Sequence, residues 1–314
     1  METVILDAAT LGDDIDLTLF DEFGETKIYR QTPPEQTAER IKNADFVIIN
    51  KIKLNETNLK YADNLKLICI AATGFDNVDT DYCRRCGIAV SNVVGYSTNC
   101  VSQLTMAMAL SLITHLPEYN CCTESGEYTR SGVQNCLTPV YHEIAGKTWG
   151  IVGYGNIGKK VGSIAEALGC NVIVNKKNPD RLENFTDIDT LCKNSDIISI
   201  HTPLNAGTKN LINKERIAMM KPNAIVINVA RGAVVDEAAL CSAVKSGAIG
   251  GIGVDVYSTE PYGDDSPYAA VAGLDNVCLT PHMAWGAYEA RIRCINEIKL
   301  NIKAFLEGKE RNRV

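Results

Sequence analysis

Short, almost continuously apolar runs alternate with amphipathic stretches along the first hundred residues. The runs lie at residues 3–7, 45–50, 65–71 and 88–94. Continuous apolar runs are typical of parallel strands in a sheet that is covered on both faces. The stretch at 34–41 has a helical pattern, and Gly87 stands where a helix needs a left-handed C-cap. The pattern predicts one small α/β unit.

A long helical stretch at about 100–115 precedes a second α/β series, which begins at Thr148. Its strands read TWGIVG, NVIV, DIISI, AIVINV, GIGVDV and NVCLTP. Helical patterns lie between them, for example at 159–168 and 236–246, where Asp236 is a suitable N-cap and Gly247 a suitable stop. Strands joined by helical crossovers predict a doubly wound parallel sheet.

The length of 314 residues favours two domains, because one hydrophobic core usually stops growing below this size. The last predicted helix, at about 286–307, follows the completed second series. It either packs on the second sheet or returns to the first.

Composition and charge limit the classes of partner. Hydrophobic residues make up 46% of the chain and the net charge is −7, which argues against nucleic-acid or anionic-membrane surfaces. We find no leader sequence after Met1 and no apolar stretch near the ~20 residues of a membrane span, and therefore expect a cytoplasmic protein. The twelve cysteines are scattered, with one Cys-x-x-Cys at Cys83 and Cys86, so we expect reduced thiols and no metal site.

The glycine motif GYGNIG is the most specific local signal. Gly153, Gly155 and Gly158 close a predicted strand and open a predicted helix, which is the context that a dinucleotide-binding loop requires. The glycines permit a tight turn, close approach of a pyrophosphate and packing of the helix on the strand. The N-terminus of the helix would supply N–H groups to the phosphates. A glycine-rich turn without a ligand is the weaker alternative.

The end of the next strand bears on the choice of cofactor. An NAD site normally carries an acidic residue here, but this chain has Asn175, Lys176 and Lys177, with no acid until Asp180. Two lysines and an asparagine would suit a 2′-phosphate, which slightly favours NADP(H) over NAD(H). A solvated turn without a role in cofactor choice is the alternative.

Polar side chains follow several strands of the second series, at the edge where ligands of open α/β sheets bind. Arg231 would hold a carboxylate through paired hydrogen bonds. His282 would give and take a proton, and a carboxylate such as Glu260 would fix its tautomer and favour its protonated form. With a hydride donor, this set suits reduction of a 2-keto acid. Singly, Arg231 could form a surface ion pair, Glu260 could be a turn residue and His282 a loop histidine. Together, at strand ends of one sheet, the three residues favour a catalytic site.

The other histidines are weaker candidates. His201, with Thr202 and Pro203, ends a strand and would line the cofactor site or simply bond to backbone. We expect His115 to be structural within a helical run and His142 to lie in a loop.

Several longer stretches carry a family resemblance. They read GYGNIG, HTPLNAGTKNLI, MKPNAIVINVARGAVVDEAAL, GVDVYSTEP and TPHMAW. Through them the chain resembles the D-isomer-specific 2-hydroxyacid dehydrogenases along nearly its whole length. Within that family it is most similar to the glycerate dehydrogenases (hydroxypyruvate reductases), through INK, ATGFDNVD, VVGYST and Trp285.

The resemblance implies a fold of two Rossmann-like doubly wound domains with the active site in the cleft between them. Residues 1–99 and 286–314 would form the substrate domain, and residues 100–285 would bind the dinucleotide. It also implies a homodimer held by the larger domain. The residues themselves predict no nucleic-acid or membrane partner, because the net charge is negative, and no catalytic metal, because the sequence has no His-x-x-x-His pattern or carboxylate cluster.

The resemblance assigns roles to individual residues. Arg231 would bind the carboxylate and keto oxygen, His282 would be the general acid and base, and Glu260 would orient and charge His282. The implied cofactor contacts are Gly153, Gly155, Asn156, Ile157, Gly158, Asn175, Lys176, Lys177, His201, Thr202, Pro203, Thr208, Val229, Ala230 and Asp255. The implied substrate contacts are Lys51, Ala72, Thr73, Gly74 and Trp285. Many relatives carry Asp at the position of Lys176, which leaves the choice between NAD and NADP open.

The resemblance leaves three alternatives on the same fold. A nucleotide-sensing corepressor would bind the cofactor without turnover, and the complete Arg–Glu–His set speaks against it. Formate dehydrogenases carry Gln where this chain has Glu260. Phosphite dehydrogenases keep the same three residues, so only a substrate test separates them.

Overall fold

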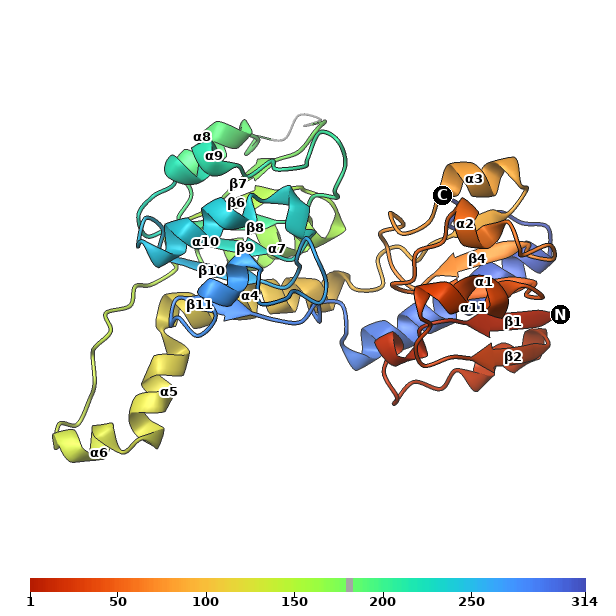
Figure 1. The fold of residues 1–314 in the computed structure, drawn as a ribbon. Helices are drawn as coiled ribbons and strands as arrows, with labels where there is room; N and C mark the ends of the chain where they lie inside the picture. Colours follow the sequence, from red (N-terminus) through yellow and green to blue (C-terminus); the bar gives the residue numbers. More distant parts are fainter. Residues whose placement is uncertain (179–182) are drawn as a thin grey trace. The chain divides into compact units, whose positions relative to one another are not determined.

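The computed structural model describes residues 1–178 and 183–314 and divides into two compact units (Figure 1). Unit 1 comprises Met1–Ser97 with Gly286–Val314, and unit 2 comprises Thr98–Trp285. The sequence-based boundary after residue 99 lies close to this division.

Unit 1 contains a five-stranded parallel sheet in the order β2-β1-β3-β4-β5. Its strands are β1 (Glu2–Ile5), β2 (Glu25–Ile28), β3 (Phe46–Ile49), β4 (Leu67–Ile70) and β5 (Ala89–Ser91). Its helices are α1 (Thr37–Ile41), α2 (Glu56–Leu59), α3 (Thr80–Arg85) and α11 (Tyr288–Leu306), with 3₁₀ turns at Ala8–Leu11, Thr18–Phe23 and Pro34–Gln36. Every residue of β3 and β4 is buried, as expected for continuous apolar runs between two helical layers. Strand β2, at the edge and only partly buried, was not predicted.

Helix α11 belongs to unit 1, which decides between the two placements that the sequence left open. The Phe305 ring meets that of Phe46 on β3 edge-to-face, with centroids 6.1 Å apart. The buried amide of Asn301 donates to the carbonyl of Asn92 at 2.9 Å. The C-terminal helix therefore completes the cover of the first sheet.

Unit 2 contains a six-stranded parallel sheet, as predicted, and its strand order is β11-β10-β9-β8-β6-β7. The strands are β6 (Thr148–Val152), β7 (Asn171–Asn175), β8 (Ile197–Ile200), β9 (Ile225–Asn228), β10 (Gly251–Val254) and β11 (Val277–Leu279). The helices are α4 (Thr98–Thr114), α7 (Asn156–Ala167), α8 (Ile188–Asn194), α9 (Lys214–Ala218) and α10 (Glu237–Lys245), with 3₁₀ turns at Gly232–Val234 and Pro267–Ala270. The strand order reverses between β6 and β8, which is where ligands of such sheets bind.

Local contacts explain several of these elements. The Asp236 carboxylate accepts the N–H of Ala239 and caps α10, and Gly247 follows that helix with a φ of +73°. The buried indole of Trp149 on β6 donates to Ser199 on β8 at 2.9 Å. This bond ties together the two strands at the topological switch.

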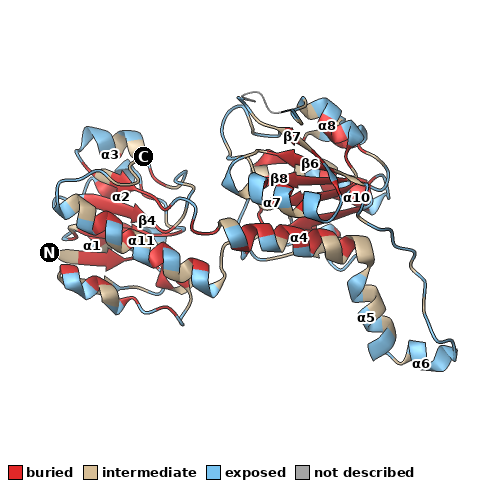
Figure 2. Ribbon diagram, turned by 180° about the vertical axis from the view of Figure 1, so that it is seen from behind, coloured by how far each residue is buried: buried red, intermediate tan, exposed pale blue. Residues whose placement is uncertain are grey.

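An arm stands away from the rest of unit 2 and was not predicted (Figures 1 and 2). It consists of α5 (Leu116–Glu124), α6 (Glu127–Ser131) and the return segment 132–145. His115 lies at the elbow between α4 and α5 in the left-handed region, with a φ of +51°, and not within a helix as expected. Its Nδ1 lies 2.8 Å from Glu118 Oε1, in keeping with a structural role. No residue of α5 or α6 is buried.

Among the described residues, no single helix is long and apolar enough to cross a membrane. Helices α4 and α5 pass that test only as a pair, bent by 62°.

Candidate active site

The glycine loop between β6 and α7 has the geometry of a dinucleotide-binding turn. Gly153 has a φ of +92°, and a Cβ there would lie 2.6 Å from the backbone nitrogen of Thr202. A Cβ on Gly158 would lie 2.2 Å from the carbonyl oxygen of Gly153. Gly155 is the N-cap of α7, and a Cβ there would meet nothing within 4 Å. Two glycines are thus needed for packing, and the middle one faces open space at the helix N-terminus.

His201 lies directly beside this loop, at the end of β8. Its backbone N–H donates to the carbonyl of Val152 at 2.7 Å. Both nitrogens of its imidazole ring are buried with no hydrogen-bond partner within the described residues. Although part of the residue is exposed, burial of the imidazole lowers its pKa to about 3, so the ring is neutral. A buried polar atom without a partner needs an explanation, and a bound polar ligand is one that fits beside this loop. The loop therefore fits a dinucleotide.

Thr208 differs from this pattern. Its hydroxyl donates to the carbonyl of Pro203 at 2.6 Å and accepts the N–H of Asn205 at 2.8 Å. The described bonds of Thr208 therefore hold the loop that follows β8. Its predicted cofactor contact stays a prediction.

The end of β7 lies next to the glycine loop, as the sequence indicated. The N–H of Gly153 donates to the carbonyl of Asn175 at 2.8 Å, and the Asn175 amide donates to Thr186 at 2.9 Å. Lys176 is partly buried and Lys177 is exposed. Asp180 lies outside the described residues.

Arg231 follows β9 in an extended conformation, and Asn228, the last residue of β9, holds its backbone. The fully buried Asn228 side chain accepts the N–H of Ala230 at 3.1 Å and donates to the carbonyl of Arg231 at 3.0 Å. Arg231 Nη1 also donates to Ala230 at 2.9 Å. Asn228 was not predicted as a site residue, although a polar residue at the end of an apolar strand was the available signal.

His282 and Glu260 meet although they follow different strands. His282 Nδ1 lies 2.6 Å from Glu260 Oε2, and the side chains are 20% and 29% exposed. The other carboxylate oxygen of Glu260 accepts the N–H of Tyr257 at 3.0 Å. His282 has a φ of +52°, which fixes the direction of its side chain. The pair has the arrangement of an oriented acid–base histidine.

Asp255 lies fully buried after β10 and binds the loop that carries His282. Its carboxylate accepts the hydroxyl of Thr280 at 2.6 Å and the N–H groups of Met283 and Ala284 at 2.8 and 3.0 Å. Burial raises the pKa of Asp255, and these bonds and His282 oppose that shift. Since these bonds all go to the loop of His282, Asp255 acts on loop position. Its expected contact with the cofactor stays a prediction.

Most of the predicted substrate residues lie in unit 1. Thr73 donates to the carbonyl of Val93 at 2.8 Å, and Asn92 donates to the carbonyl of Thr73 at 2.7 Å, which fixes the segment Ala72–Gly74. The backbone N–H of Lys51 donates to Asp7 at 2.6 Å. Trp285 is partly buried and is the last residue of unit 2.

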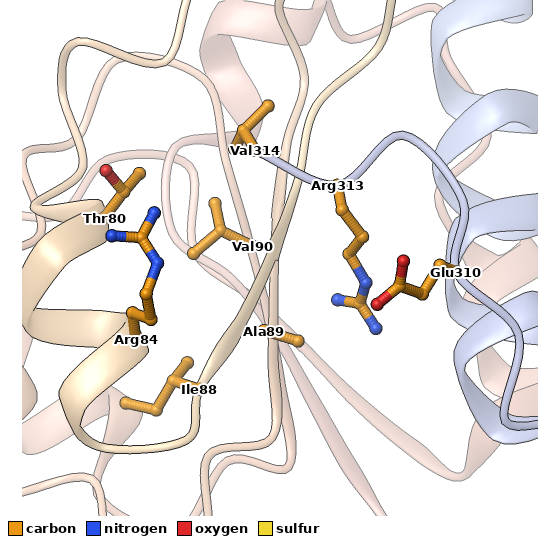
Figure 3. Close-up of a pocket in the computed structure, with 8 residues that line it drawn as sticks. All are labelled: Thr80, Arg84, Ile88, Ala89, Val90, Glu310, Arg313 and Val314. Atoms are coloured by element: carbon orange, nitrogen blue, oxygen red, sulfur yellow. The ribbon is translucent and has the colours of Figure 1, made fainter.

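The described residues contain no cluster of three His, Cys, Asp or Glu side chains that could hold a metal ion. A pocket of about 270 Å³ in unit 1 lies between α3, β5 and the C-terminal residues and contains no predicted site residue (Figure 3).

The glycine loop at a topological switch, together with an oriented histidine and an arginine at strand ends, defines a dinucleotide-dependent oxidoreductase. A family model described as "D-isomer specific 2-hydroxyacid dehydrogenase, NAD binding domain" matches residues 106–284. A glycerate dehydrogenase of Methylorubrum extorquens is 39% identical over 291 residues, covering 92% of this chain and 91% of that protein. A hydroxypyruvate reductase of Blautia hydrogenotrophica is 35% identical and covers 98% of both chains.

A solved structure has the same fold. An acyclic imino acid reductase in complex with NADPH and D-Arg has a TM-score of 0.87 at 30% identity and covers 100% of both chains. This chain therefore belongs to the family of D-isomer-specific 2-hydroxyacid dehydrogenases. It is an oxidoreductase that uses a nicotinamide cofactor.

Proposed function

We propose that this chain reduces a small 2-keto acid, of the hydroxypyruvate or glyoxylate kind, to the D-2-hydroxy acid with NAD(P)H. The observation that carries the proposal is the 2.6 Å contact between His282 and Glu260, in the unit that also holds the glycine loop and Arg231. The similarity to a glycerate dehydrogenase and a hydroxypyruvate reductase along nearly the whole chain supports this class of substrate.

The roles follow from the chemistry of each side chain. A bound nicotinamide cofactor would supply the hydride for the keto carbon. His282 gives a proton to the keto oxygen through Nε2, because Nδ1 is engaged by Glu260. Arg231 binds the substrate carboxylate and stabilises the charge that develops on the keto oxygen. In the reverse direction, His282 takes the proton from the hydroxyl group.

The proposed cofactor is NADP(H) in preference to NAD(H). In unit 2, Gly153, Gly155 and Gly158 would surround the pyrophosphate, and Asn156 and Ile157 would offer the first N–H groups of α7. Asn175, Lys176 and Lys177 lie at the end of β7, where an acid would repel a 2′-phosphate and a lysine attracts one. The remaining proposed contacts are His201, Thr202, Pro203, Thr208, Val229, Ala230 and Asp255.

Unit 1 is proposed as the substrate domain, and Lys51 together with the backbone of Ala72–Gly74 as its carboxylate-binding groups. Trp285 is proposed as a further substrate contact. Seven of the twelve cysteines are buried free thiols, which suits a reducing compartment such as the cytoplasm.

A homodimer is proposed, with the arm of residues 116–145 as its contact. Leu116, Leu137 and Val140 are 62%, 70% and 70% exposed in the single chain. Such apolar exposure on a segment that buries little against its own unit is typical of a surface covered by a second copy.

A matrix of reactions tests cofactor and substrate together. NADH and NADPH are each combined with glyoxylate, hydroxypyruvate, pyruvate and a branched-chain keto acid, and oxidation of the cofactor is followed at 340 nm. We expect the highest kcat/KM with hydroxypyruvate or glyoxylate and NADPH. Cofactor binding without turnover would indicate the nucleotide-sensing alternative. In a separate reaction with the oxidised cofactor, oxidation of phosphite without reduction of any keto acid would indicate a phosphite dehydrogenase.

A further inference from the structure

A buried carboxylate in unit 1 holds the segment that carries Lys51. Asp7 follows β1 and is only 3% exposed. It accepts the backbone N–H groups of Asn50 at 3.0 Å, Lys51 at 2.6 Å and Ile52 at 3.2 Å. Residues 50–52, called the Lys51 loop below, thus wrap three consecutive N–H groups around one anion, as in the concave backbone arrangements that bind anions elsewhere.

Burial of the Asp7 carboxylate costs free energy unless its oxygens accept hydrogen bonds that the loop needs. Burial raises the pKa of Asp7, and the bonds from the Lys51 loop and the charge of Lys51 act in the opposite direction. A neutral amide at this position would offer one oxygen to three donors and would turn its NH₂ group towards them. The carboxylate is the side chain that satisfies the loop.

A second side chain fixes the same loop by its carbonyl groups. Asn77, from the stretch ATGFDNVD, donates its amide to the carbonyls of Asn50 at 3.2 Å and Ile52 at 2.9 Å. The side chain of Asn50 is held in turn, since it donates to Thr10 at 3.0 Å. The N–H and C=O groups of the Lys51 loop are therefore both engaged by side chains.

Asp7 repeats in unit 1 what Asp255 does in unit 2. Each is a buried aspartate that follows a parallel strand and accepts backbone N–H groups of a loop far away in sequence. The loop held by Asp255 carries His282, and the loop held by Asp7 carries Lys51.

We propose that Asp7 is a positioning residue for the substrate, because its carboxylate fixes the backbone from which Lys51 reaches the 2-keto acid. The inference rests on the proposed function, within which Lys51 binds the substrate carboxylate. A lysine side chain loses rotamer entropy when its ammonium group binds an anion. If the backbone that carries it is already fixed, no further backbone entropy is lost on binding. Loss of Asp7 should therefore weaken substrate binding more than the chemical step.

The experiment compares Asp7→Asn with Asp45→Asn in the full chain. Asp45 is the matched control because it precedes β3, accepts the N–H of Glu2 at 2.8 Å and pairs with Lys66 at 2.7 Å, at the other end of the strand from the Lys51 loop. We expect Asp7→Asn to raise the KM of hydroxypyruvate about tenfold. We expect kcat to stay within about threefold, and the KM of the cofactor and all constants of Asp45→Asn to stay at wild-type values.

A double-mutant cycle with Lys51→Met shows whether Asp7 acts through Lys51. Lys51→Met should raise the KM of the keto acid at least as much as Asp7→Asn does, and Asp7→Asn should add nothing in that background. If Asp7→Asn cannot be purified folded, Asn77→Ala loosens the same loop and should raise the same KM about threefold.

The outcomes separate the inference from the function on which it rests. An active wild-type enzyme whose KM is unchanged by Asp7→Asn or by Lys51→Met overturns the inference alone. So does a full effect of Asp7→Asn in the Lys51→Met background, or an equal rise in KM in Asp45→Asn. A wild-type chain that reduces no 2-keto acid overturns the proposed function and the inference with it.

Discussion

Oε2 of Glu260 lies 2.6 Å from Nδ1 of His282, while Oε1 of the same carboxylate accepts the N–H of Tyr257 at 3.0 Å. Both oxygens of Glu260 are therefore held, one by the imidazole and one by backbone. The contact with a carboxylate places the Nδ1 proton between the two side chains and directs Nε2 to other partners. The geometry thus assigns the two ring nitrogens different tasks.

Glu260→Gln should lower kcat by about 10²–10³, because a neutral amide no longer stabilises the doubly protonated imidazole of His282 that donates the proton. The amide oxygen would stay with the N–H of Tyr257, and the NH₂ group would then face Nδ1. Steady-state kinetics with hydroxypyruvate measures the loss. Glu237→Gln is the matched control, since Glu237 accepts the N–H of nearby Ser258 at 2.8 Å and should leave kcat unchanged. Full activity of Glu260→Gln would contradict the assigned role.

His282→Ala should nearly abolish reduction, with a fall in kcat of about 10²–10⁴, because the proton donor to the keto oxygen is removed. Cofactor affinity, measured by quenching of protein fluorescence, should stay at the wild-type value. His142→Ala is the control, because His142 is an exposed loop residue. A His282→Ala variant with wild-type kcat would remove this residue from the mechanism.

Lys176→Asp should shift the preference from NADPH towards NADH by at least about tenfold in the ratio of kcat/KM values, because an aspartate repels a 2′-phosphate and accepts the ribose hydroxyls. Lys177→Asp, one residue further from β7, should have a smaller effect. The measurement is kcat/KM for each cofactor at saturating keto acid. An unchanged ratio in Lys176→Asp would assign this lysine to a solvated turn.

Leu137→Asp and Val140→Asp in the arm should convert the proposed dimer into a monomer, because each buries a charge at the contact. Light scattering after size-exclusion chromatography at micromolar concentration gives the mass. Leu274→Asp, which changes another partly exposed leucine of unit 2, should leave the measured mass equal to that of the dimer. A monomeric wild-type chain, or variants that stay dimeric, would show that the arm has another function.

The sequence predicted those parts of the fold that depend on local pattern. The six strands of unit 2 were readable because each is a continuous apolar run, and α10 because Asp236 and Gly247 mark its ends. Strand β2 was missed because ETKI has no apolar run. The arm was missed because no residue of α5 or α6 is buried, so these helices have no buried face that would require apolar residues at helical spacing.

The residues of the candidate site also divide into those that a local pattern reveals and those that depend on the fold. His282, Glu260 and Arg231 could be proposed from the sequence because their chemistry and their place after strands are visible along the chain. The roles of Asn228 and Asp7 were not found, because each depends on which backbone groups the fold brings to a side chain. Asp7 and the N–H of Lys51 are 44 residues apart in sequence, and only the parallel sheet makes them neighbours.

His201 should make the stability of unit 2 depend on pH in an identifiable window. Burial lowers its pKa from 6.5 to about 3, so below pH 6.5 the unfolded chain binds a proton that the folded chain excludes. The stability that depends on a neutral His201 is fully present above pH 6.5 and is lost as the pH falls towards 3. Between pH 7.5 and 5.0, wild type should lose about 1–2 kcal/mol more free energy of unfolding than His201→Gln, measured with urea on the cofactor-free chain. His142→Gln should follow wild type, and equal losses in all three proteins would show that His201 is accessible to protons in the folded state.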